Sequence, residues 1–159
     1  MSQDMCVPCG DGLLNLRVGA VIVKDGKLLM VGNGRSDYLY SVGGRIQFGE
    51  TAEEAVVREV REETGVTMPV KRLAFVHENY FYGDAPTNCG KLIYELSFFF
   101  LMDVPDGFEP VSASFAEDGA AEYLCWVAPD TPLTIYPAFF RTDALAPPDG
   151  VTYFRTDER

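Results

Sequence analysis

The chain has 159 residues, of which 47% are hydrophobic and 23% are charged. These values lie near the averages of globular proteins, so they exclude a fibrous repeat or a chain disordered throughout and favour one folded domain. The formal net charge of −11 argues against polymeric DNA or RNA as a partner, because basic side chains that neutralise phosphates supply most of the affinity for nucleic acid.

Residues 1–12 are interpreted as an N-terminal tail, and residues 13–159 as a single domain because no linker divides them. The first residues include Asp4 and no basic apolar stretch, so we expect no secretory signal and a cytoplasmic protein. Cys6 and Cys9 form a C-x-x-C pair, a spacing found in zinc and redox sites. Because the other cysteines are isolated, we interpret all of them as reduced thiols, with metal or disulfide use as the alternative.

Residues 16–24 and 27–31 are rich in aliphatic side chains and are separated by an Asp-Gly pair, a pattern that predicts a β-hairpin. Residues 38–42 predict a short strand. The Gly43-Gly44 pair that follows is expected to end this strand and to begin a loop.

Residues 51–64 predict a helix with a signal at each end. Thr51 and Glu54 form a T-x-x-E capping box, in which each side chain binds a backbone N–H near the helix start. Gly65 follows the last helical residue, where glycine readily adopts the left-handed conformation that stops a helix.

Residues 70–82 and 92–102 predict two strands of a long hairpin, joined by a turn-prone segment. The longest apolar run, 96–102, is far shorter than the about 20 residues that a membrane helix needs, so we expect no membrane span.

The last third of the chain predicts shorter elements. Residues 103–118 predict a loop, 123–127 a strand, 137–145 a short helix that begins at a proline, and 151–154 a final strand. Strands on both sides of one strong helix, with a later helix, indicate a mixed α/β domain.

Three carboxylates are crowded on the predicted helix. Glu59, Glu62 and Glu63 stand at positions i, i+3 and i+4, which places them on one arc. Like charges at this spacing destabilise a helix by about 0.2–0.5 kcal/mol per pair, so the arrangement suggests a function. Arg58 can bridge these carboxylates. Mg²⁺ prefers oxygen ligands, and a triple-glutamate arc meets that preference, although acid-rich helices are ordinarily solvated faces.

The segment GRIQFGETAEEAVVREVREETGV, at 44–66, matches the pattern G-x5-E-x7-R-E-U-x-E-E-x-G-U at every fixed position. These positions are Gly44, Glu50, Arg58, Glu59, Val60, Glu62, Glu63, Gly65 and Val66. The pattern resembles the signature of the Nudix (MutT-like) hydrolases, and the flanking strands resemble that family over about residues 13–145. The resemblance implies an α/β/α sandwich with a mixed β-sheet and a catalytic loop-helix-loop.

The resemblance also implies a Mg²⁺-dependent hydrolase, with Mn²⁺ as a substitute ion. Its substrate would be a small nucleotide in which a nucleoside diphosphate is linked to another moiety, as in ADP-ribose, dinucleoside polyphosphates, nucleotide sugars or nucleoside triphosphates. Glu59 and Glu63 are then the principal Mg²⁺ ligands, Glu62 is an additional or water-bridged ligand, and the Gly44 carbonyl is a further oxygen. Gln47 stands where a glutamate is common in the family, which leaves the number of ions open.

The cations are expected to bridge the diphosphate and to orient a water for in-line attack at phosphorus. We nominate Glu122 or Glu117 as the acceptor of the water's proton, with Glu59 as the candidate inside the motif. Surface solvation is the alternative for the two later acids. The candidate catalytic residues are Arg58, Glu59, Glu62, Glu63 and Glu122, of which Arg58 acts structurally together with Glu50.

The candidate substrate-binding residues are Gly43, Gly44, Arg45 and Tyr82. The glycines allow a close approach of the backbone to an ion or a phosphate. Tyr82 belongs to an aromatic cluster with Phe75, Tyr80 and Phe81 that can stack a base or simply pack within the sheet. His77, the only histidine, is interpreted as a structural residue.

Two alternatives to the hydrolase remain. One is a nucleotide-sensing module on the same fold, because fold alone does not determine function. The other is a Nudix-like isomerase acting on a prenyl diphosphate, which needs a cysteine over the reacting carbon, and Cys89 is not evidently placed for it. The complete acid set favours the hydrolase. No residue requires a homodimer, although pairing through a strand edge or a helix is open.

Overall fold

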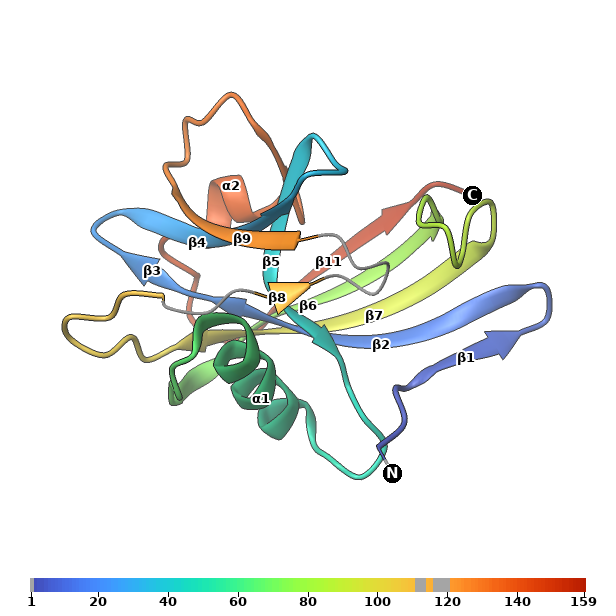
Figure 1. The fold of residues 1–159 in the computed structure, drawn as a ribbon, viewed down its shortest axis with the longest axis horizontal. Coiled ribbons are helices and arrows are strands. Elements are labelled where there is room, and N and C mark those ends of the chain that lie inside the picture. The colour runs from blue at the N-terminus through green and yellow to red at the C-terminus, as the bar shows by residue number, and fades with distance from the viewer. Residues whose placement is uncertain (1, 111–113, 116–120) are drawn as a thin grey trace.

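The computed structural model describes residues 2–110, 114–115 and 121–159. Within these residues one mixed sheet runs in the strand order β11-β6-β7-β2-β5-β4-β9-β8 (Figure 1). The elements are β1 (Cys6–Cys9), β2 (Gly12–Val21), β3 (Val23–Lys24), β4 (Lys27–Asn33), β5 (Tyr38–Arg45), α1 (Ala52–Thr64), β6 (Val70–Tyr82), β7 (Leu92–Met102), β8 (Ser114–Phe115), β9 (Ala121–Val127), β10 (Thr134–Tyr136), α2 (Phe140–Asp143) and β11 (Thr152–Asp157).

The hairpin predicted for 70–82 and 92–102 is confirmed, because β6 and β7 pair antiparallel over nearly their whole length. The hairpin predicted for 16–24 and 27–31 is confirmed only next to the Asp-Gly turn, where β3 pairs antiparallel with β4. Residues 16–21 belong to β2, which pairs with β5 and β7 instead. Parallel pairing occurs between β2 and β7, β5 and β10, and β6 and β11. The mixture of both kinds of pairing brings residues far apart in the sequence to the centre of the sheet.

The segment interpreted as an N-terminal tail contains strand β1, which pairs antiparallel with the start of β2. The chain before β1 is also bound to the loop that precedes α1. The Met5 N–H donates to the Ile46 carbonyl at 2.8 Å, and the Phe48 N–H donates to the Gln3 carbonyl at 2.7 Å. A salt bridge of 3.7 Å joins Asp4 to Arg45. These first residues therefore support the loop on one side.

The expectation that Gly43-Gly44 ends a strand is wrong, because β5 continues through both glycines to Arg45. Gly43 pairs with Gly19 of β2, and a Cβ on Gly43 would lie 2.2 Å from the Val18 carbonyl oxygen. The glycines therefore serve a close approach of two backbones within the sheet and do not terminate the strand.

The later elements differ from the sequence expectations in their lengths. The predicted loop 103–118 contains β8, while 111–113 and 116–118 lie outside the described residues. The predicted helix 137–145 is helical only in α2, and β10 precedes it. The final strand runs farther than predicted because β11 pairs with β6 through Asp157.

Apolar side chains alternate between the two faces of the sheet and form two cores. One core packs under α1 and includes Ala20, Ile22, Leu29, Val31, Val56 and Val60. The other packs under α2 and includes Val21, Leu28, Met30, Phe75, Phe99 and Phe140. Successive residues of one strand point to opposite faces, so the two helices cover opposite faces. The predicted α/β/α sandwich is confirmed.

The helices of the described residues, α1 and α2, are too short and too polar to cross a membrane.

The two-core arrangement predicts very different effects for two phenylalanines. Phe75 is fully buried, whereas Phe48 is 81% exposed. Phe75→Ala leaves a cavity, so we expect it to lower the free energy of unfolding by about 3–5 kcal/mol in urea denaturation. Phe48→Ala is the control and should change it by less than about 0.5 kcal/mol. Equal effects of the two substitutions would contradict the assigned core.

Candidate active site

Helix α1 begins and ends at the residues that its sequence predicts. The Thr51 hydroxyl accepts a hydrogen bond from the Glu54 N–H at 3.2 Å, and the Glu54 carboxylate accepts one from the Thr51 N–H at 2.8 Å. At the other end Gly65 has a φ of 77° and donates to the Arg61 carbonyl at 2.9 Å. Both expected caps are confirmed, and they fix where the acids of the helix lie.

Arg58 connects the helix to the preceding loop and to the end of β5. Its guanidinium binds both oxygens of Glu50, at 3.0 Å and 2.6 Å, and donates to the Arg45 carbonyl at 3.0 Å. It also donates to Glu59 at 2.8 Å and lies 3.4 Å from Glu62. The paired guanidinium holds the pKa of Glu50 below its usual range. This geometry supports the structural role expected for Arg58 and Glu50.

Two of the helix acids lie against the glycine backbone of β5. A Cβ on Gly44 would come within 2.4 Å of the Glu59 carboxyl carbon, so only glycine leaves room for that carboxylate. The Gly43 N–H donates to the Glu63 carboxylate at 3.3 Å. The glycines therefore allow a close approach, here of side chains that are candidate metal ligands.

Burial and mutual repulsion dominate the electrostatics of the acids. Glu63 is only 8% exposed, and burial raises its pKa to about 8, with further increases from the nearby charges of Glu122 and Glu59. Burial also raises the pKa of Glu59, and the Arg58 guanidinium opposes this shift. The nearby arginines offset only part of these effects, because the pKa of both acids stays above its usual range.

Glu122 also lies at this site, although it belongs to strand β9 and not to the helix that carries the other acids. Glu122 lies on β9 opposite Asn33 of β4, close enough to influence both Glu63 and the Tyr40 hydroxyl. Burial raises the pKa of Tyr40 to about 12, and the charge of Glu122 raises it further, so this hydroxyl keeps its proton at neutral pH. The other nominated acid, Glu117, lies outside the described residues.

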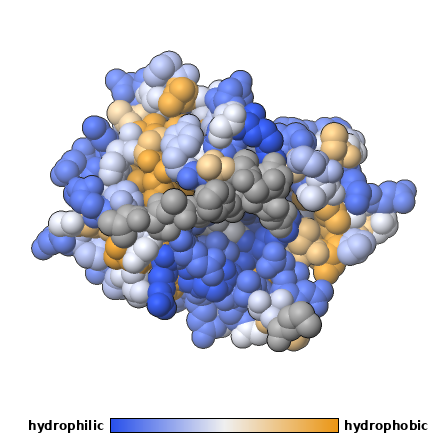
Figure 2. Space-filling model, viewed as in Figure 1, coloured by the Kyte–Doolittle hydropathy of each residue, from blue (hydrophilic) through white to orange (hydrophobic). Residues whose placement is uncertain are grey.

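The third helix acid is the most exposed. The Glu62 side chain is 58% exposed, in contrast to 14% for Glu59. It therefore lies at the rim of the site, as expected for an additional ligand rather than a principal one. Figure 2 shows hydrophilic residues gathered over α1.

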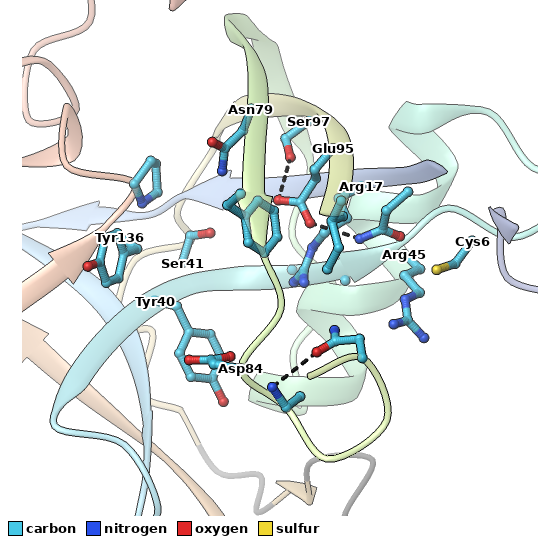
Figure 3. A pocket seen from close by; sticks show the side chains of 18 of the residues that line it. Cys6, Arg17, Tyr40, Ser41, Arg45, Asn79, Asp84, Glu95, Ser97 and Tyr136 are labelled. Carbon is cyan, nitrogen blue, oxygen red and sulfur yellow. Dashed lines mark hydrogen bonds between the residues drawn. The ribbon is translucent and has the colours of Figure 1, made fainter. Parts of the chain in front are cut away.

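A cleft of about 790 Å³ opens beside the acids and holds most of the predicted site residues (Figure 3). Gly43, Gly44 and Arg45 line it, together with Glu59, Glu62, Glu63 and Glu122. Tyr82 lines the cleft and is 52% exposed, so it is available for a substrate. Within the aromatic cluster, packing in the sheet is confirmed for Phe75, which is a core residue, whereas Phe81 lines the cleft and base stacking stays a prediction.

Arg17, a cation that lines the cleft from β2, was not among the residues predicted from the sequence. Its charge lowers the pKa of both Glu59 and Glu63. Within the described part of the chain, its side chain forms no hydrogen bond or salt bridge, so its donors are open to a ligand. A charged residue inside an otherwise aliphatic strand was the signal that could have identified it.

The acids suit a hard divalent cation, although they do not form a finished metal centre. In residues 2–110, 114–115 and 121–159 no three acidic, histidine or cysteine side chains are grouped closely enough to hold an ion. The donors are nevertheless all oxygens, and the crowding that raises the pKa of Glu63 is a repulsion that a cation relieves. Binding would draw Glu59 and Glu63 toward a shared ion.

The Arg58 network predicts a pH-dependent loss of stability in one variant. Arg58→Met leaves the poorly exposed Glu50 without a cationic partner and with only the Gln47 N–H as a donor, so we expect the free energy of unfolding at pH 7 to fall by about 2–3 kcal/mol. The bound guanidinium lowers the pKa of Glu50, so its stabilisation is present above the carboxyl's unfolded pKa and is lost as the pH falls through the folded pKa. The gap between variant and wild type should therefore narrow below about pH 4.

The measurement is urea denaturation across this pH range, with the exposed Arg61→Met on the same helix as the control. A loss that is equal for the two variants, or that does not change with pH, would show that the Arg58 ion pairs do not hold the helix.

A family model for the NUDIX domain matches residues 13–144. An ADP-ribose pyrophosphatase from Methanocaldococcus jannaschii is 40% identical over 65 residues, which span 39% of this chain and 38% of the relative. A MutT NUDIX hydrolase structure from Burkholderia pseudomallei is 28% identical, with a TM-score of 0.59 over 79% of this chain and 92% of that one.

A mutator MutT protein from Bacillus halodurans has a TM-score of 0.64 over 91% of both chains at 21% identity, a likeness that concerns the fold alone. The family match covers most of the chain and includes the whole acid helix and the glycine pair that faces it. This chain therefore belongs to the Nudix family of hydrolases.

Proposed function

We propose that this protein is a Mg²⁺-dependent hydrolase that cleaves a phosphoanhydride bond in a nucleoside diphosphate linked to another moiety. The convergence of Glu59, Glu63 and Glu122 beside the glycine backbone of β5, at one end of a cleft, carries this proposal. A binding module that needs no ion has no reason to crowd three carboxylates where burial already opposes their charge. The name of the Methanocaldococcus jannaschii relative, ADP-ribose pyrophosphatase, agrees with this substrate class.

The charges of the cleft suit a diphosphate that arrives with a cation. Arg17 faces the acids and has free donors, so it can bind phosphate oxygens directly. When bound, a divalent cation supplies charge neutralisation for the diphosphate and a polarised water. Glu59 and Glu63 would hold it, with Glu62 at the rim and the Gly44 carbonyl as a further oxygen.

Glu122 is our candidate for the general base. It lies close enough to Glu63 and to the Tyr40 hydroxyl for its charge to raise the pKa of both groups. From this position Glu122 would accept the proton of a water near the diphosphate as the water attacks phosphorus. Arg58 keeps Glu59 in place through its hydrogen bond to that carboxylate.

The proposed hydrolysis is tested with ADP-ribose, a dinucleoside polyphosphate, a nucleotide sugar and a nucleoside triphosphate, each with Mg²⁺ and then with Mn²⁺. We expect wild type to hydrolyse at least one of them. Glu63→Gln should lower its kcat by at least about 100-fold, because it removes a charged ligand from the cation. Phosphate or nucleotide release, followed by chromatography, provides the measurement.

The control is Glu53→Gln, which makes the same chemical change at an exposed position on the same helix. It should keep the activity of wild type. Tight nucleotide binding with no turnover of any compound, in wild type and both variants, would instead favour a nucleotide-sensing module.

Two alanine substitutions separate the glycine contact from general effects on the chain. Gly44→Ala introduces a Cβ that collides with the Glu59 carboxylate, whereas Gly34→Ala introduces one with nothing within 4 Å. We expect Gly44→Ala to weaken Mn²⁺ binding by at least about 10-fold, as read by electron paramagnetic resonance, because a principal ligand is displaced. Gly34→Ala should bind like wild type, and equal affinities of all three proteins would exclude Glu59 as a ligand.

A further inference from the structure

The floor of the cleft beyond the acids is one face of three adjacent strands, β2, β7 and β6 (Figure 1). Their register aligns side chains into rows that cross the strands. One row is polar and consists of Asn15, Glu95 and Asn79, and the next row outward is apolar and consists of Leu13, Ile93 and Phe81. All six residues line the cleft.

The polar character of this floor needs a cause, because a buried sheet face is ordinarily apolar. Asn15 is 5% exposed, and Ser97 and His77 in the next row inward are also buried. Burying such groups is unfavourable unless they find partners. His77 has one in Thr156, at 2.9 Å from its Nε2 atom, as expected for a structural histidine. The pair of Asn15 and Glu95 is less completely satisfied.

Glu95 is a half-buried carboxylate with spare capacity to accept hydrogen bonds. One oxygen accepts from the Asn15 amide at 2.8 Å, and the other accepts from the Ser97 hydroxyl at 3.4 Å. Within the described residues Glu95 forms no salt bridge. Figure 3 shows Glu95 among the side chains that surround the cleft, near Arg17. A carboxylate offers about four acceptor positions, so at least one remains for a ligand.

Asn15 positions the Glu95 carboxylate. Its amide nitrogen must face Glu95, because the opposite orientation would set a carbonyl oxygen against a carboxylate. Its Oδ1 atom is consequently turned away, and it is buried without a hydrogen-bond partner in the described residues. The acceptors that remain for a ligand at this point of the floor are therefore those of the Glu95 carboxylate.

We propose that Glu95, held in place by Asn15, selects a guanine base by accepting hydrogen bonds from its N1–H and 2-amino groups on its two carboxylate oxygens. This inference rests on the proposed function, since it names the nucleoside of that substrate. Adenine presents an acceptor at N1, which a carboxylate repels, whereas guanine presents adjacent donors. The apolar row of Leu13, Ile93 and Phe81 provides a surface for the flat face of the ring.

The position of the polar row agrees with a nucleotide that spans the cleft. Asn15 lies two residues from Arg17 on the same strand face, so the two rows are about 7 Å apart. A diphosphate held near Arg17 and the acids therefore directs its nucleoside toward Glu95. A ribose diol also offers two adjacent donors, and the test must distinguish it from the base.

The test is isothermal titration calorimetry of GDP, IDP, ADP and 2′-deoxy-GDP with Mg²⁺, for wild type and Glu95→Gln. Wild type should bind GDP about 10- to 100-fold more tightly than ADP, with IDP between them because it lacks the 2-amino group. Glu95→Gln should reduce the ratio of GDP to ADP affinity at least about 10-fold, since an amide can donate to adenine N1. Binding of 2′-deoxy-GDP should match that of GDP.

The control is Glu78→Gln, which changes a half-buried glutamate on the opposite face of the same sheet, bound to the Tyr94 and Tyr153 hydroxyls. It should keep the preference for GDP. Circular dichroism establishes that each variant is folded. If Glu95→Gln does not fold, the affinities of wild type for GDP, IDP and ADP still test the preference for guanine.

Equal affinities of wild type for GDP, IDP and ADP would overturn the proposal. Weaker binding of 2′-deoxy-GDP than of GDP, with no preference among the three bases, would also overturn the proposal and would assign Glu95 to the ribose. Because binding is measured without turnover, selective GDP binding by a protein that hydrolyses nothing would refute the proposed function alone. Hydrolysis without base preference would refute this inference alone.

Discussion

The geometry of the site depends on the guanidinium of Arg58. This group binds the Glu50 carboxylate in the loop, the Arg45 carbonyl at the end of β5 and the Glu59 carboxylate on its own helix. A planar fork fixes direction as well as distance, so rotation of α1 about its axis would break several of these bonds together. The position of each acid on the helix follows from this anchor and from the two caps.

Apolar packing and charge repulsion act on the two sides of helix α1. On one side Val56 and Val60 are fully buried and hold α1 against the sheet. On the other side Glu63 is pressed into a buried position where the charges of Glu59 and Glu122 repel it. The apolar contacts of Val56 and Val60 oppose this repulsion and keep the carboxylates crowded against β5.

Local signals made the helix predictable, whereas side-chain pairing across the sheet was not. The caps of α1 involve residues three or four positions apart, and the hairpin turns are equally local. The contact of Asn15 with Glu95 joins residues 80 positions apart, and no pattern within either strand indicates the register that brings them together. The Gly43-Gly44 pair misled because glycine serves both turns and close backbone contacts.

The segment that contains strand β1 lies outside the signature, yet it contacts the loop that leads to the candidate site. Hydrogen bonds from Met5 and to Gln3 hold the loop at Ile46 and Phe48, and this loop carries Glu50 to Arg58. Changes in the first ten residues that displace this backbone would therefore also displace the loop and the candidate acids that Arg58 holds. Relatives that share the whole signature but differ in this leading segment need not hold these acids in the same geometry.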